Sequence, residues 1–205
     1  MSVLLGLALM MASDAAGPWR VVKPEEMPKA MHDLQVWRQR VTVASDHLAE
    51  LPEADRAAAL SVAISGTDDY VKDIYGKVGY RSRVDQWAAF HMSSVLMDQL
   101  ADLADRLDYP TMAACHRLER DHLSEVAHSG KTTKTHCRAQ VYDDAFSKAA
   151  ESSFHGPERE RIMQATAEWT RATNMVAYIT ADLGLPEANE PTDGPGEPNP
   201  QQESP

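Results

Sequence analysis

The chain lacks the basic stripe that proteins binding nucleic acid usually carry. It has 20 Lys and Arg against 31 Asp and Glu, a formal net charge of -11, and only 6% aromatic residues. Without a Lys/Arg cluster interleaved with aromatic side chains, nucleic-acid binding is excluded as the expected function. The acidity fits either solubility or the attraction of a basic protein partner.

The sequence also lacks the short motifs that mark common catalytic and cofactor sites. It has no G-x-S-x-G, no P-loop, no G-x-G-x-x-G, no H-E-x-x-H and no C-x-x-C-H haem attachment motif. The sequence therefore predicts no cofactor and gives no basis for assigning an enzymatic activity.

No apolar run is long enough to cross a membrane, which takes about 20 residues. The run at residues 3–12 has ten residues, and Ser13 and Ala15 follow it as small residues before a cleavage site. Although no Lys or Arg precedes the run, we interpret residues 1–15 as a signal peptide. A periplasmic or secreted protein is expected, without stable membrane insertion. The alternative is a cytoplasmic protein in which residues 1–15 begin an ordinary first helix.

The last 20 residues differ in composition from the body of the chain. Residues 186–205 hold six of the twelve prolines and five acidic residues, with no Lys or Arg. Such a segment cannot bury enough apolar surface to offset its ordering entropy, so we predict a disordered tail. Residues 16–185 are left as one domain, long enough to bury about 70% of the surface of its unfolded chain.

Apolar residues return every three or four positions in segment after segment, which is the spacing of one helix face. We expect each such stripe to be buried between helices, in an all-α, antiparallel up-down bundle of long helices. Three of these stripes are Met27, Met31, Leu34, Val41, Ala44, Leu48 and Leu51; Ala57, Leu60, Ile64, Thr67, Val71, Ile74 and Val78; and Ile162, Thr166, Trp169, Thr173, Val176, Thr180 and Leu183.

Proline, glycine and capping residues divide residues 24–185 into about six helices. The second stripe crosses Gly66 without a change of phase, so that segment is predicted to be a single helix. The expected helices span about 24–51, 53–77, 82–108, 110–129, 135–152 and 157–184.

The chain has two cysteines, Cys115 and Cys137, and export would favour a disulfide between them. In a simple helical hairpin, however, Cys115 lies about 20 Å from the turn and Cys137 only a few ångströms from it. A bridge needs the two Cα atoms within about 7 Å, so we expect none unless the helix breaks early. A Cys2His2 zinc site with His116 and His136 meets the same objection.

Histidines and carboxylates are densest at residues 116–128, which contain two Glu-x-x-His motifs. Di-iron bundles draw such motifs from different helices, whereas these two lie on one, so we interpret the segment as a solvated face. Glu119 is the exception, because it shares an apolar stripe and is expected to point to the core. His91 also shares an apolar stripe, so a structural pair of Glu119 and His91 is expected in preference to a catalytic one.

These patterns favour an exported, non-enzymatic helical protein that acts through a protein-binding surface, as an inhibitor, immunity-like protein, adaptor or chaperone. We expect that surface to hold exposed aromatic residues, with Trp19, Tyr70, Tyr75 and Tyr80 as candidates. Assembly with further copies of the chain is left open. The alternative is a small-ligand or metal-binding bundle, with redox or hydrolytic activity, built around His91, Glu119 and His122.

Overall fold

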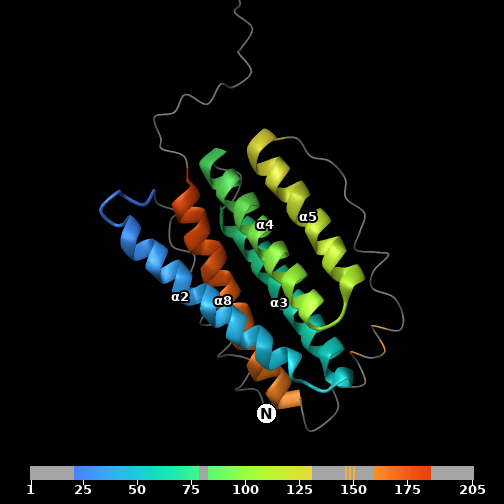
Figure 1. Ribbon diagram of the computed structural model, residues 1–205. Helices are drawn as coiled ribbons and strands as arrows, with labels where there is room; N and C mark the ends of the chain where they lie inside the picture. Colours follow the sequence, from blue (N-terminus) through green and yellow to red (C-terminus); the bar gives the residue numbers. More distant parts are fainter. Residues whose placement is uncertain are drawn as a thin grey trace, which may run out of the picture.

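The computed structural model describes residues 21–78, 83–130 and 159–185, together with Phe146, Lys148 and Ala150. Within these residues the chain is all-α, with five helices packed against one another and no strand, which confirms the predicted fold class (Figure 1). The predicted signal peptide, most of the helix predicted at 135–152 and the segment 186–205 lie outside the described residues. The helices are α2 (Met27–Ala49), α3 (Glu53–Val78), α4 (Arg83–Arg106), α5 (Pro110–Ser129) and α8 (Arg159–Gly184).

Local sequence signals account for most of these bounds. α5 begins at Pro110, whose missing N–H costs nothing in a first turn, and ends at Gly130. Gly130 has φ 67, a left-handed conformation that suits glycine, and its N–H donates to the carbonyl of Val126 at 2.9 Å. α3 is continuous through Gly66, as predicted. A Cβ at this position would lie 3.4 Å from the side chain of Thr170, so glycine allows α3 to approach α8 closely.

Neighbouring helices alternate in direction along most of the chain. α2 and α4 run one way, and α3, α5 and α8 run the other (Figure 1). α4 and α5 form an antiparallel hairpin with the most extensive contacts in the described part of the chain. α8 lies against α2, α3 and α4, and α4 contacts all four of the other described helices. α5 packs on the outer side of α4.

The main core lies between α2, α3, α4 and α8, where Leu48, Leu60, Leu100 and Trp169 are fully buried. The indole N–H of Trp169 donates to the hydroxyl of Ser45 at 3.1 Å, so the one polar atom of this large side chain is satisfied. A second, smaller cluster gathers residues from α3, α4 and α8, including Tyr70, Ile74, Ala89, Met92, Leu96, Ala177 and Ala181.

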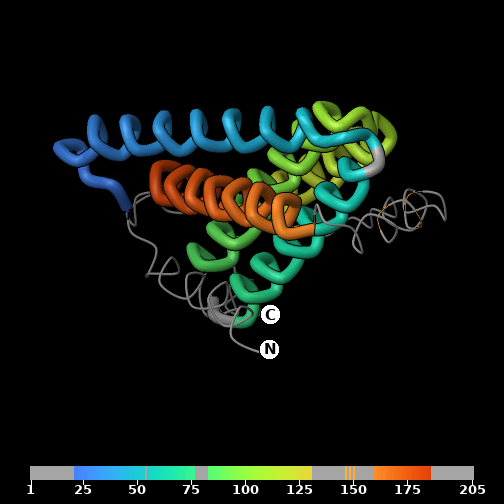
Figure 2. Tube along the Cα trace, turned by 90° about the horizontal axis from the view of Figure 1, so that it is seen from below, coloured from blue at the N-terminus to red at the C-terminus, as the bar shows by residue number. Residues whose placement is uncertain are grey.

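The first predicted stripe is only partly correct. Leu34, Val41 and Leu48 are buried, but Met27 and Met31 are 37% and 52% exposed. The first turns of α2 extend past the end of α8 (Figure 2). The periodicity therefore predicted the correct face of the helix, but it could not show that the neighbouring helix ends before the stripe does.

Candidate functional site

α5 holds a buried pair of titratable residues that the sequence pattern did not predict. His116 is 2% exposed, and its Nδ1 atom lies 3.4 Å from Oε2 of Glu119 one turn later on α5. The side chain of Glu119 is 12% exposed, so the expectation that it points inward is confirmed. Among the described residues, neither ring nitrogen of His116 makes a hydrogen bond. The contact therefore joins two buried titratable groups without strong hydrogen-bond geometry.

The prediction that His116 lies on the solvated face of α5 is wrong. Its position follows Met112 by four residues and precedes Leu123 by seven, which is the same 3.6-residue stripe that identified Glu119. The signal was therefore present, but the dense charges around it hid the periodicity.

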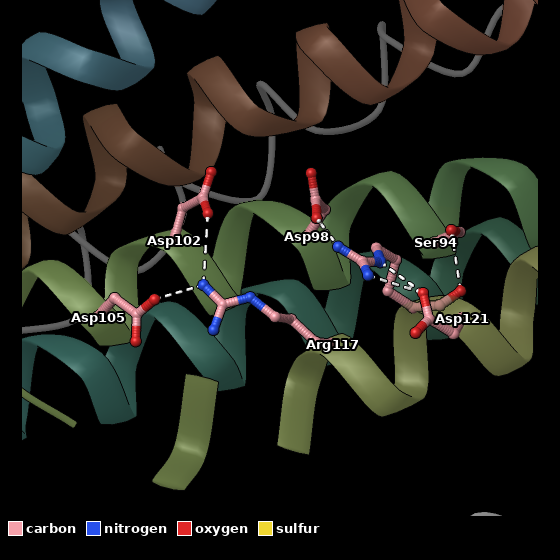
Figure 3. Close-up of polar contacts among 7 residues, drawn as sticks. Ser94, Asp98, Asp102, Asp105, Arg117 and Asp121 are labelled. Atoms are coloured by element: carbon pink, nitrogen blue, oxygen red, sulfur yellow. Dashed lines mark hydrogen bonds and ion pairs between the residues drawn. The ribbon is translucent and has the colours of Figure 1, made fainter. Parts of the chain in front are cut away.

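Ion pairs between α4 and α5 cover the outer edge of the seam where these two helices meet. Asp98, Asp102 and Asp105 follow one face of α4 at helical spacing, opposite arginines on α5. Figure 3 shows Arg117 directed from α5 toward Asp102 and Asp105, with which it forms ion pairs. Burial first, and then the negative charge of Asp98, raise the pKa of Asp102. Since these groups are largely exposed, they align the helices more than they stabilise the fold.

Arg120 fixes the other half of the seam. Its guanidinium contacts Asp98 on α4 at 2.7 Å and its own neighbour Asp121 at 2.8 Å. Its main-chain carbonyl accepts a hydrogen bond of 3.1 Å from the hydroxyl of Ser94 on α4 (Figure 3). These contacts of Arg120 hold α4 and α5 in register.

His91 lies apart from this seam, where the start of α4 meets the end of α8. Its ring stacks on Trp87, with centroids 4.7 Å apart and planes at 13°. A Cβ at Gly184 would lie 3.0 Å from the indole and 3.8 Å from Nε2 of His91, so α8 ends against this stack. Burial, and then the charge of His128, lower the pKa of His91. The environment therefore favours a neutral imidazole in a structural contact.

The three residues named for a metal site do not form one. Within residues 21–78, 83–130 and 159–185, no group of three or more His, Cys, Asp or Glu could hold a metal ion. Glu119 contacts His116, and His91 stacks on Trp87, so the predicted pair of Glu119 and His91 is replaced by two separate contacts. His122, also on α5, is partly exposed.

Of the four aromatic residues expected on a binding surface, the structure describes two, Tyr70 and Tyr75. Tyr70 is buried in the smaller core cluster. Burial, and then the charge of Asp73, raise the pKa of Tyr70 to about 12. Tyr75 is partly buried and accepts a hydrogen bond of 3.4 Å from Ser93. Trp19 and Tyr80 lie outside the described residues.

Cys115 is buried and disulfide-bonded. The predicted pair also involves Cys137, which lies outside the described residues, so the statement about the two cysteines stays a prediction. α5 runs unbroken through Cys115, without the early break that was considered for this helix.

With this geometry described, comparison with known proteins adds no assignment. No protein-family model matches the chain, and neither a curated protein nor a solved structure matches it. None of the described helices is long and apolar enough to cross a membrane. The function must therefore be argued from the surface and the packing of this chain alone.

Proposed function

We propose that this chain is an exported, non-enzymatic helical protein that acts by binding another protein through the exposed beginning of α2. Inhibitor, immunity-like, adaptor and chaperone roles all fit such a surface. The surface comprises Met27 and Met31, with Val21 just before the helix.

The exposed continuation of a core stripe is the observation that carries this proposal. Met27 and Met31 stand one helical turn apart, so their side chains are neighbours on the helix surface. Val21 is also 41% exposed. Methionine side chains are flexible and polarisable, which suits a surface that must fit an apolar pocket. A partner that extends the bundle past α8 would bury the same stripe that α8 buries farther along α2.

The charges near these methionines balance, since Lys23 and Lys29 stand beside Glu25 and Glu26. Apolar contact is therefore the expected source of affinity at the surface itself. The net charge of -11 acts at longer range and favours encounter with a basic partner. The partner is accordingly a protein with an apolar pocket on a positively charged face.

The disulfide at Cys115 supports the export part of the proposal. Structural disulfides persist in oxidising compartments such as the periplasm and are rare in the cytosol. The apolar run at residues 3–12 supports the same interpretation.

The proposal is tested by comparing two lysine substitutions on α2. Met31→Lys places a charge on the proposed surface. Val43→Lys is the matched control, because Val43 is 48% exposed on the same helix but lies about 120° away around its axis. Purified wild-type protein is used to capture partners from the native cell extract, and a captured protein is then purified and titrated.

We expect one protein to bind the wild type and Val43→Lys alike, and to bind Met31→Lys at least about tenfold more weakly, or about 1.4 kcal/mol. Circular dichroism should be the same for all three proteins, because both positions are exposed. Equal weakening by the two substitutions, or capture of no partner, would contradict the proposal.

A further inference from the structure

Two arginines from different helices converge on one tryptophan at the face formed by α2 and α8. The guanidinium carbon of Arg40 lies 4.4 Å from the ring centroid of Trp37, and that of Arg171 lies 5.9 Å from it. Trp37 itself is partly buried against the main core, so the indole is held in place from below. A guanidinium held at an aromatic ring keeps its planar fork of N–H donors available to an anion.

Neither Arg40 nor Arg171 forms an ion pair with a carboxylate in the described part of the chain. By contrast, Arg106, Arg117 and Arg120 each pair with an aspartate. The two guanidiniums therefore lie at one aromatic ring without a carboxylate from the described residues. Carboxylates are the groups that such a fork binds best, through paired N–H donors.

The segment 186–205 carries the matching chemistry. Glu190 and Glu197 each precede a proline, and Asp193 lies between them, with no Lys or Arg in the segment. Arg171 lies 14 residues before Leu185 on α8, which corresponds to about 21 Å along the helix. A proline-rich chain extends by about 3.1 Å per residue, so about seven residues beyond Leu185 are needed to cover that distance. Asp193 and Glu197 meet this condition, whereas Glu187 does not.

We propose that residues 186–205 bind back across α8, so that Asp193 and Glu197 pair with Arg40 and Arg171 beside Trp37. The segment is tethered, and a short flexible tether gives an effective concentration of the order of millimolar. A contact too weak to persist between separate molecules is therefore populated within one chain. The contact covers the surface formed by Trp37, Arg40 and Arg171. It is independent of any partner at the beginning of α2.

The test uses the full chain throughout and follows the indole N–H resonance of Trp37 by NMR, assigned with Trp37→Phe. The first variant, Asp193→Asn with Glu197→Gln, neutralises the proposed carboxylates. The second, Arg40→Gln with Arg171→Gln, removes the guanidiniums. Two controls match them. Glu187→Gln changes a carboxylate that is too close to Leu185, and Arg38→Gln changes an exposed arginine on α2 with no recorded contact to Trp37.

We expect the Trp37 resonance to shift when Asp193 and Glu197 are neutralised, and 0.5 M NaCl to produce the same shift in the wild type. In the Arg40→Gln, Arg171→Gln background, neutralising the two carboxylates should cause no further shift. Both controls should behave as the wild type does. A Trp37 resonance that is unaffected by neutralisation overturns the proposal. An effect that grows with protein concentration also overturns it, because the segment would then come from a second copy.

Discussion

The stability of this protein at acid pH should depend on His91, whose ring stacks on Trp87. Its folded-state pKa is lowered, first by burial and then by the charge of His128, so the unfolded chain takes up a proton more readily. Stability should therefore fall as the pH drops below about 6.5, with a slope of at most about 1.4 kcal/mol per pH unit for one proton. Above that pH both states are neutral and the effect vanishes.

The substitution His91→Phe keeps a ring against Trp87 and removes the titration. Urea unfolding between pH 8 and pH 5 should show a flatter acid limb for His91→Phe than for the wild type. His128→Gln should remove only part of the slope, because the charge of His128 is the smaller cause. Parallel curves for the wild type and His91→Phe would show that His91 does not contribute.

The burial of single residues was predicted best for those that lie on one apolar stripe of a helix. The inward direction of Glu119 followed from its apolar neighbours, and so did the burial of Leu34, Leu60 and Trp169. The contact partner of Glu119 could not be predicted in the same way, because both His116 and His91 satisfied a stripe. That choice depends on how α4 and α5 are rotated about their axes, which a one-dimensional pattern does not contain.

Two glycines of α3 give a matched test of how closely helices pack. A Cβ at Gly76 would meet nothing within 4 Å, whereas one at Gly66 would lie 3.4 Å from Thr170. Gly76→Ala should stabilise the protein by about 0.5–1 kcal/mol through helix propensity. Gly66→Ala should gain less, and Gly66→Leu should destabilise by about 1–3 kcal/mol because it pushes α3 from α8. Thermal unfolding of the three variants measures this order. A stable Gly66→Leu would mean that the helices are not in close contact there.

Helix bounds were largely predictable, because proline and glycine act locally. Pro110 and Gly130 bracket α5 at the predicted positions, and α3 continues through Gly66 as its unbroken stripe indicated. The exposed beginning of α2 and the disulfide at Cys115 were harder to predict. Each depends on where another segment of the chain lies. The exposure of Met31 and the disulfide at Cys115 therefore could not be predicted from the sequence of the helix that holds each residue.

The disulfide at Cys115 should matter for the stability of the chain as a folded unit. A bond to Cys137, the only other cysteine in the sequence, would close a loop of about 23 residues, for which the chain-entropy model gives about 3 kcal/mol. Chemical unfolding in the presence and absence of a thiol reductant should show a loss of about that size.

The intact mass of protein from the native cell should be two daltons below that of the reduced chain, with residues 1–15 removed. A reduced, uncleaved chain would argue for the cytoplasmic alternative.

The most direct measurement of the proposed function is site-specific photo-crosslinking in the native cell. A photoreactive amino acid is introduced at position 31 in the exposed beginning of α2, and at position 43 in a control protein, where Val43 is similarly exposed. Our account predicts a discrete crosslinked species from position 31, with one partner protein in it, and none from position 43. Crosslinks of equal yield from both positions, or none from position 31, would contradict it.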